Sequence, residues 1–121
     1  MMKLIRSFGY AWTGIRACFQ SEPNFRIHSV LAIVALLLSI GLNISTMEWI
    51  AVCFCIAFVL VMEMFNTAIE KLCDAVHKDV HPGIKKVKDI AAGAVLIAAF
   101  FSAITWAVIF LPKIGNLIKS M

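Results

Sequence analysis

The pattern of apolar and polar residues divides the chain into one amphipathic segment and three long apolar runs. The segment 3–20 has apolar residues at helical spacing on one side and polar residues over most of the other. It is too polar to span a bilayer, so we expect a surface helix that lies in the membrane interface with its basic side toward anionic headgroups. Packing of this helix against the protein's own spans is an alternative, and both can hold at once. Pro23 is expected to end the helix, because proline disfavours helical backbone at the residue before it.

The three apolar runs that follow predict membrane-spanning helices. A spanning helix needs about 20 residues. The first and third runs are uncharged and qualify directly, and the third run stops at Pro112. The second is uncharged from Trp49 to Met62 and continues in helical register through Glu63 to Val76, so it spans only if its polar end emerges at the membrane surface. The expected spans are about 28–45, 49–70 and 90–111.

Composition supports a membrane protein with one domain, residues 1–121. Hydrophobic residues make up 62% of the chain and charged residues 15%, against about half and a quarter in an ordinary soluble domain. The mean hydropathy is +0.94. Lipid is the simplest partner for this excess of apolar surface. We therefore predict an all-α integral membrane fold of three transmembrane helices and the surface helix.

The basic residues are distributed as membrane topology would place them. The net charge is +4, and the connection 43–48 between the first two runs has no basic residue. By the positive-inside rule the N-terminus and the loop 72–89 are cytoplasmic and the C-terminus lies outside. Basic residues that flank apolar runs, instead of forming a stripe among aromatic residues, speak against nucleic acid as a partner. They are Lys3, Arg6, Arg16 and Arg26 before the first run, Lys71, Lys78, Lys85, Lys86 and Lys88 between the second and third, and Lys113 and Lys119 after the third.

Small residues in the third run predict close helix packing. Ala94, Ala98 and Ser102 form a ridge at four-residue spacing, and such ridges let helices approach closely in lipid. Three spans bury little surface by themselves, so we expect an oligomer. The ridge alone would allow a dimer.

The polar end of the second run carries the most informative chemistry. At 100° per residue, Glu63, Asn66, Glu70 and Asp74 lie within about 60° of one another on a helix. An ionised carboxylate costs about 2.5–3.5 kcal/mol at the centre of a bilayer and less near its surface, and like charges at this spacing repel one another. A metal cation would relieve both penalties. The alternative is a solvated helix end whose carboxylates meet only water and lysines.

Other polar residues are less specific. The cluster Lys85-Lys86-Val87-Lys88-Asp89 is typical of a topology signal and could also neutralise phosphates. His77 and His81 have i,i+4 spacing, but Pro82 follows and no partner motif supports a zinc site, so we interpret them as loop residues. The sequence has neither a Gly-x-x-x-x-Gly-Lys-Ser/Thr loop nor a Gly-rich kinase loop. If ATP is used, metal-bridging carboxylates and lysines must hold its phosphates.

The stretch Glu63-Met-Phe-Asn-Thr-Ala-Ile-Glu70, with Asp74 four residues on, resembles the signature of the prokaryotic diacylglycerol kinase family, which includes undecaprenol kinases. The resemblance covers nearly the whole chain, from Tyr10 through Glu22 to the stretch 88–96. It implies a bacterial inner-membrane lipid kinase that transfers the γ-phosphate of ATP, with Mg²⁺, to diacylglycerol or undecaprenol. The products would be phosphatidic acid or undecaprenyl phosphate.

The resemblance also implies an assembly and a site. The family pattern is a homotrimer with active sites at the cytoplasmic interface, shared between neighbouring subunits. By motif match Glu63 would be the general base that accepts the proton of the lipid hydroxyl. The other implied roles are metal binding on the ATP phosphates by Glu22 and Glu70, phosphate contact by Lys88, completion of the polar site by Asn66, Asp74 and Asp89, and nucleotide contact by Tyr10.

Two departures from the diacylglycerol-specific pattern bear on the substrate. Lys3 stands where those members often have arginine, and Ile27-His28 also differs. The string Asn24 to His28, like His81-Pro82, looks more similar to the undecaprenol-kinase branch. These similarities favour undecaprenol as the substrate, and diacylglycerol remains an alternative.

Two other classes remain as alternatives. A small proton-coupled exporter would use one acid within a span and usually a fourth helix, whereas this chain has a stripe of acids at one end of a run and only three runs. A non-catalytic assembly subunit would need no stripe. Replacing Glu63 with Gln separates them, because a subunit should keep its function while a kinase should lose turnover without losing its oligomer.

Overall fold

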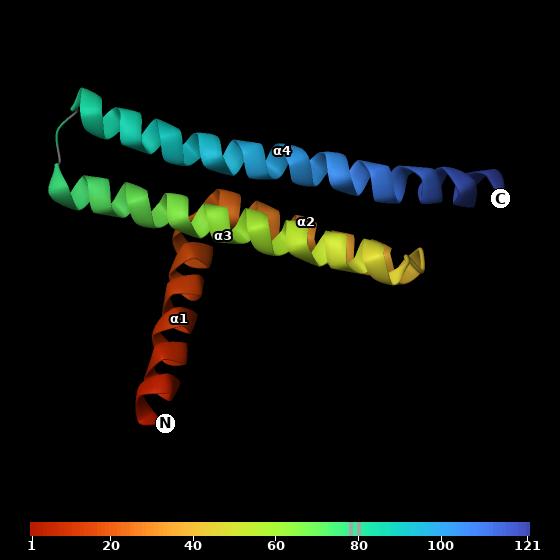
Figure 1. The fold of residues 1–121 in the computed structure, drawn as a ribbon, viewed down its shortest axis with the longest axis horizontal. Coiled ribbons are helices and arrows are strands. Elements are labelled where there is room, and N and C mark those ends of the chain that lie inside the picture. The colour runs from red at the N-terminus through yellow and green to blue at the C-terminus, as the bar shows by residue number, and fades with distance from the viewer. Residues whose placement is uncertain (78, 80) are drawn as a thin grey trace.

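The computed structural model describes residues 1–77, 79 and 81–121, and these residues form four helices without a strand (Figure 1). Lys78, counted above among the basic loop residues, lies outside the described residues, as does Val80. The all-α prediction is confirmed, with three helices that are long and apolar enough to cross a membrane. The helices are α1 (Met2–Ser21), α2 (Pro23–Gly41), α3 (Thr46–Val76) and α4 (Pro82–Lys119).

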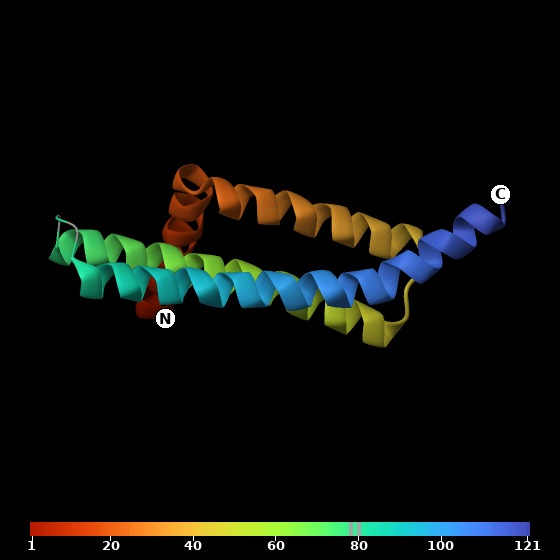
Figure 2. The same cartoon turned by 90° about the horizontal axis from the view of Figure 1, so that it is seen from above.

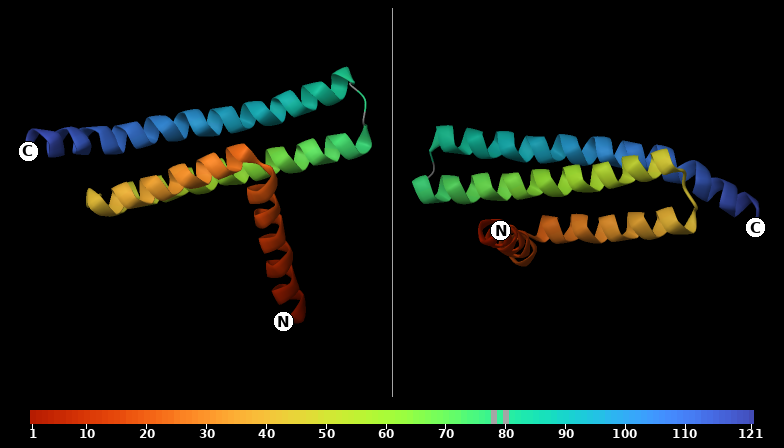
Figure 3. Two further views of the ribbon diagram at one scale, coloured as in Figure 1. Left: turned by 180° about the vertical axis from the view of Figure 1, so that it is seen from behind. Right: turned by 60° about the horizontal axis from the view of Figure 1, so that its bottom comes forward.

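Helices α2, α3 and α4 lie side by side, and α1 projects away from them (Figures 1 and 3). The most extensive packing is between α3 and α4, followed by α2 against α3, and α1 contacts the rest only near its C-terminal end. The last part of α3 and the first part of α4 extend beyond the start of α2 (Figures 1 and 2). The polar part of α3 therefore begins beside the junction of α1 and α2 and continues past it alongside α4.

The α1–α2 junction is fixed by proline chemistry and by one arginine. Glu22 has extended backbone between the two helices, so α1 ends before Pro23 as the sequence predicts, and Pro23 is the first residue of α2. The Arg26 guanidinium donates from Nη1 to the carbonyl oxygens of Phe19 and Gln20, at 2.9 Å each. These carbonyls end a helix and have no intrahelical partner, so Arg26 satisfies them and holds α1 at a fixed direction to α2.

The opposite end of the bundle is built on a capped turn. Asn43 has a positive φ of 52°, which asparagine tolerates better than most residues. Ser45 then caps α3: its hydroxyl accepts from the Glu48 amide at 3.2 Å, and the Glu48 carboxylate accepts from the Ser45 amide at 2.9 Å. This capping box satisfies two amides that a helix start leaves unpaired.

Helix α4 does not end where the apolar run ends. The sequence indicates a stop at Pro112, but the helix continues through this proline to Lys119, and its C-terminal part changes direction (Figure 2). Two contacts account for the continuation. Lys113 Nζ lies 3.3 Å from Glu48 Oε1, and Ile114 packs against the buried cluster at this end of the bundle. The proline bends the helix instead of ending it.

Little side-chain surface is buried within one chain. The main cluster of buried residues lies at the capped end and contains Val52, Ile109 and Phe110, with Trp49 and Trp106 packed against it. Of the small-residue ridge on α4, Ala98 and Ser102 are buried within the chain and Ala94 is exposed. Most large apolar residues of the three long helices remain exposed, as expected for surfaces that face lipid or other subunits.

Candidate active site

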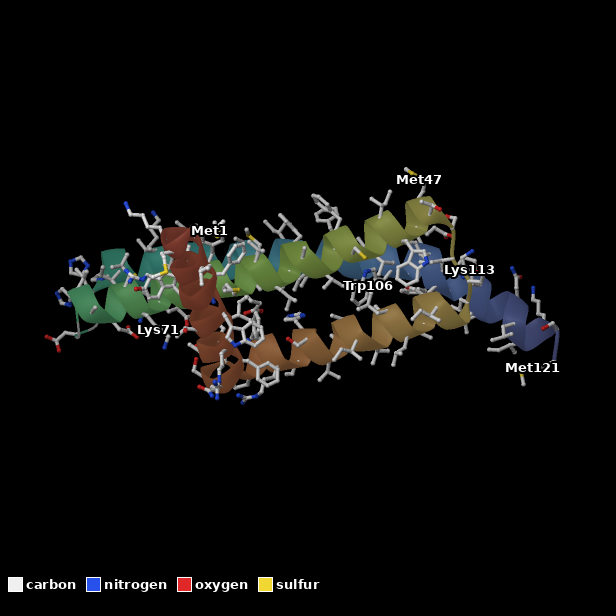
Figure 4. The ribbon with its side chains drawn as sticks, turned by 90° about the horizontal axis from the view of Figure 1, so that it is seen from below. Met1, Met47, Lys71, Trp106, Lys113 and Met121 are labelled. Carbon is white, nitrogen blue, oxygen red and sulfur yellow. The ribbon has the colours of Figure 1, made fainter. Side chains whose placement is uncertain are left out.

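The acidic stripe on α3 runs from a buried residue to an exposed one. Glu63 is buried, Asn66 and Glu70 are half-buried, and Asp74 is exposed near the end of the helix. The helical spacing thus brings these side chains onto one face, as predicted. Of the four, only Glu63 is buried by the rest of the fold. In Figure 4, Lys71, which marks this part of α3, and Lys113 lie toward opposite ends of the bundle.

Glu63 faces a histidine from the neighbouring helix. His28 Nε2 on α2 lies 3.4 Å from Glu63 Oε1 on α3. Sequence reasoning assigned His28 no chemical part, and used it only as a marker of the polyprenol branch. No local pattern could have paired the two residues, because their contact depends on how α2 and α3 pack.

Two further carboxylates belong to the same site. Glu22, at the α1–α2 junction, and Glu70, on α3, are close enough for their charges to act on Glu63. The Asn66 amide donates from Nδ2 to Glu70 Oε1 at 3.4 Å. Its carbonyl oxygen, Oδ1, is buried and has no hydrogen-bond partner among the described residues. The structure therefore gathers three carboxylates and an unpaired amide oxygen where the end of α1 meets α3.

The C-terminal turn of α1 is anchored beside this site. Cys18 on α1 and Thr67 on α3 are both buried and interact through their side chains. Burial, together with the nearby charge of Glu22, raises the pKa of the Cys18 thiol. Because the thiolate is the reactive form, Cys18 is an inert packing residue that fixes α1 against the acidic stripe.

A second group of charges joins the polar ends of α3 and α4. Lys88 Nζ on α4 lies 2.5 Å from Asp74 Oδ1 on α3. The next residue on α4, Asp89, pairs instead with Lys85 one turn earlier, at 2.7 Å, and both side chains are well exposed. Lys88 and Asp74 thus lie together at the open end of the stripe, while Asp89 does not contact the carboxylates.

The remaining candidates lie elsewhere. Tyr10 is 74% exposed, on the part of α1 that projects from the bundle (Figure 1), so a single chain does not bring it to the acidic stripe. The two histidines of the α3–α4 connection lie between helices, as interpreted from the sequence. His77 caps the end of α3, and His81 Nδ1 accepts from the Gly83 amide at 3.0 Å at the start of α4.

An apolar cavity of about 300 Å³ opens between α2, α3 and α4. Its walls include His28 and Ala32 from α2, Val59 from α3, and Ser102 and Trp106 from α4. His28, which forms part of this wall, also contacts Glu63, so a single side chain links the cavity to the buried carboxylate. The site therefore joins an apolar space inside the bundle to a polar stripe that opens at Asp74.

Three long apolar helices with a carboxylate site toward one end define a multi-pass α-helical membrane protein. The chain belongs to the prokaryotic diacylglycerol kinase family, which matches it over residues 9–110. It is 36% identical to the undecaprenol kinase of Bacillus subtilis over 112 residues, covering 93% of this chain and 91% of that one. It is 28% identical to the diacylglycerol kinase of Escherichia coli K12, with 93% of each chain covered, and 32% identical to that of Pseudomonas aeruginosa, with 92% and 90% covered.

The comparisons confirm the family resemblance and the lipid-kinase prediction. The family implies phosphoryl transfer from ATP to a lipid substrate, and it favours this activity over the exporter and assembly-subunit alternatives.

Proposed function

We propose that this chain phosphorylates undecaprenol at the cytoplasmic face of the bacterial inner membrane, with Glu63 as general base. The observation that carries the proposal is the position of Glu63, which is buried at the inner end of a polar stripe open to water and contacts His28 in the wall of an apolar cavity. A lipid alcohol has the same two-sided character, because its chain needs apolar surroundings and its hydroxyl must meet a water-soluble nucleotide.

Glu63 would take the proton of the lipid hydroxyl while the hydroxyl oxygen bonds to the γ-phosphorus of ATP. The bond from this phosphorus to the β,γ-bridging oxygen breaks, which gives the lipid phosphate and ADP. A positioned base typically contributes about 10²–10⁴-fold to the rate. Most of the remaining acceleration in phosphoryl transfer comes from positioning and charge compensation.

The residues present fit a Mg²⁺ ion. Among the described residues no group of three or more His, Cys, Asp and Glu side chains forms a complete metal site. Mg²⁺ commonly uses only one or two carboxylates, together with substrate phosphates. Glu22 and Glu70, with the unpaired amide oxygen of Asn66, supply such a donor set. When bound, the ion would offset the negative charge of the phosphates.

Lys88 and Asp74 would form the nucleotide side of the site. Lys88 is a flexible cation at the open end of the stripe, which suits contact with phosphate oxygens, and Asp74 holds it there in the absence of nucleotide. Asp89 and Tyr10 are proposed nucleotide contacts by resemblance. Asp89 follows Lys88 on α4, whereas Tyr10 is exposed on α1 and would reach a nucleotide at this site only if a neighbouring subunit of a homotrimer supplied it.

The choice of undecaprenol rests on similarity. Identity is 36% to the undecaprenol kinase of Bacillus subtilis and between 28% and 33% to the diacylglycerol kinases. Diacylglycerol is the second candidate. The orientation rests on charge, because the basic residues cluster before the first span and between the second and third.

The test is transfer of labelled phosphate from Mg-ATP to undecaprenol and to diacylglycerol, side by side in mixed micelles. The Glu63→Gln variant should lose transfer, and Glu48→Gln, a glutamate at the other end of the same helix, should retain it. We expect undecaprenol to be labelled far above diacylglycerol. The reverse preference would identify diacylglycerol as the substrate. If a folded oligomer labels neither lipid, the lipid-kinase function is rejected.

A further inference from the structure

We propose that His28, in the wall of the apolar cavity, is a positioning residue that holds the Glu63 carboxylate in the orientation needed to meet the lipid hydroxyl. The inference rests on the proposed function, since it gives His28 a part in the same reaction. His28 itself exchanges no proton with the substrate.

The contact between His28 and Glu63 is specific to one ring nitrogen. Nε2 lies 3.4 Å from Glu63 Oε1, with the two side chains 24% and 6% exposed. Among the described residues, no other ion pair or side-chain hydrogen bond reaches the Glu63 carboxylate. A buried carboxylate with a single partner takes its orientation from that partner.

The surroundings of Glu63 explain why a partner is needed. Glu22 and Glu70 both act on Glu63 with like charge. A glutamate side chain has several rotatable bonds, and this repulsion favours conformations that turn its carboxylate away from the stripe. His28 contacts the carboxylate from α2 and also forms part of the cavity wall. The histidine therefore holds the carboxylate between the phosphate side and the lipid side of the site.

The position of His28 on α2 is itself fixed. It lies on the same face as Phe25, Ala32, Ala35 and Ser39, which are the buried residues of this helix. Arg26 secures the beginning of α2 through its bonds to the end of α1. The imidazole is thus carried by a packed helix face, which is what precise positioning of a base requires.

Two isosteric substitutions separate positioning from packing. The Gln amide nitrogen reaches about as far as Nε2 of histidine, and the Asn amide nitrogen only about as far as Nδ1. Because Nε2 is the atom that faces Glu63, His28→Gln should preserve the contact and His28→Asn should lose it. Ser29→Ala is the matched control, because the Ser29 hydroxyl bonds only to the Phe25 carbonyl of its own helix.

The experiment measures kcat and KM for Mg-ATP with the lipid that the wild-type protein labels, in mixed micelles, for the three variants. We expect His28→Asn to lower kcat about tenfold or more, since misplacement of a catalytic group by about 1 Å can cost about 10²-fold. KM for Mg-ATP should change less than about twofold, and His28→Gln and Ser29→Ala should stay within about threefold of the wild-type kcat.

Equal kcat values for His28→Asn and His28→Gln, whether high or low, would overturn the inference. So would a loss confined to KM. A size and thermal-unfolding measurement on each variant identifies any that fails to fold. If His28→Asn is one of these, His28→Leu takes its place, because leucine fills the packed position on α2 but donates nothing to Glu63. It should lower kcat relative to His28→Gln, and equal kcat values for the two variants would overturn the inference. If the wild-type protein labels no lipid, the proposed function is rejected. The inference about His28 fails separately, when the wild-type protein is active but the variants do not differ as expected.

Discussion

At the scale of single residues, the carboxylates of the site differ in how deeply they are buried, and we propose different roles for them accordingly. Glu63 is buried, while Glu70 and Glu22 lie nearer to water. The stripe itself could be predicted, because one period of 3.6 residues aligns Glu63, Asn66, Glu70 and Asp74. The addition of Glu22 to it followed only from the family resemblance. His28 could not be predicted as a partner of Glu63, since nothing in a local pattern encodes the packing of α2 on α3.

Loss of a proposed metal ligand should change the magnesium requirement. Glu70→Gln removes a charge that would neutralise the ion, so we expect the Mg²⁺ concentration for half-maximal transfer to rise at least about tenfold; even outer-shell partners cost about 10–100-fold in metal affinity. A titration of transfer rate against free Mg²⁺ at saturating ATP measures this. Glu48→Gln should have the same dependence of rate on Mg²⁺ as the wild-type protein. If Glu70→Gln also has this dependence, Glu70 is not a metal ligand.

Replacement of Lys88 should weaken nucleotide binding with little effect on stability. Its pair with Asp74 is largely open to solvent, and exposed ion pairs contribute little to folding. We expect Lys88→Met to raise KM for Mg-ATP about tenfold or more, with a thermal midpoint close to that of the wild-type protein. Lys85→Met, which breaks the neighbouring pair with Asp89, should raise KM for Mg-ATP much less. A similar rise for both would indicate a general effect of positive charge.

At the scale of elements, the sequence predicted the break at Pro23 and the continuation of α3 to Val76 better than the extent of α4. Pro23 separates α1 from α2 as expected, because the restriction that proline imposes is local. The end of α4 was missed for the opposite reason. A helix-interior proline costs about 3 kcal/mol or more, and the contacts that offset it, through Lys113 and Ile114, come from the distant start of α3 and the buried cluster.

The capped start of α3 should be a stability element separate from catalysis. Ser45→Ala removes the hydroxyl that accepts from the Glu48 amide, and such a loss typically costs about 1 kcal/mol. We expect a lower free energy of unfolding in detergent and an unchanged kcat at a temperature where the protein is folded. Ser45→Asp, which can cap equally well, should retain wild-type stability. A fall in kcat with Ser45→Ala would mean that the two ends of α3 are coupled.

At the scale of the whole molecule, the exposed surfaces point beyond one chain. Tyr10 projects with α1 away from the stripe that contains Glu63. If both residues serve one nucleotide site, they must come from different subunits. The sequence pattern alone gave an oligomer of open size, because small residues such as Ala98 pack within the chain as readily as between chains.

Subunit mixing tests this arrangement directly. In trimers assembled from equal amounts of Tyr10→Ala and Glu63→Gln subunits, about a quarter of the neighbouring pairs would bring together an intact Tyr10 and an intact Glu63 at one site. We therefore expect about a quarter of the wild-type transfer rate, provided that each variant alone is nearly inactive. Trimers that carry two affinity tags, one on each variant, can be purified, and these should give about a third of the wild-type rate, because every mixed trimer has one such pair among its three. Mixing Glu70→Gln with Glu63→Gln should restore no transfer at a low Mg²⁺ concentration where Glu70→Gln alone is nearly inactive, because the two carboxylates lie on one helix and would serve the same site from one chain. If the Tyr10 mixture stays as inactive as its parents, the complete site lies within single subunits, and α1 must then move toward α3 when nucleotide binds.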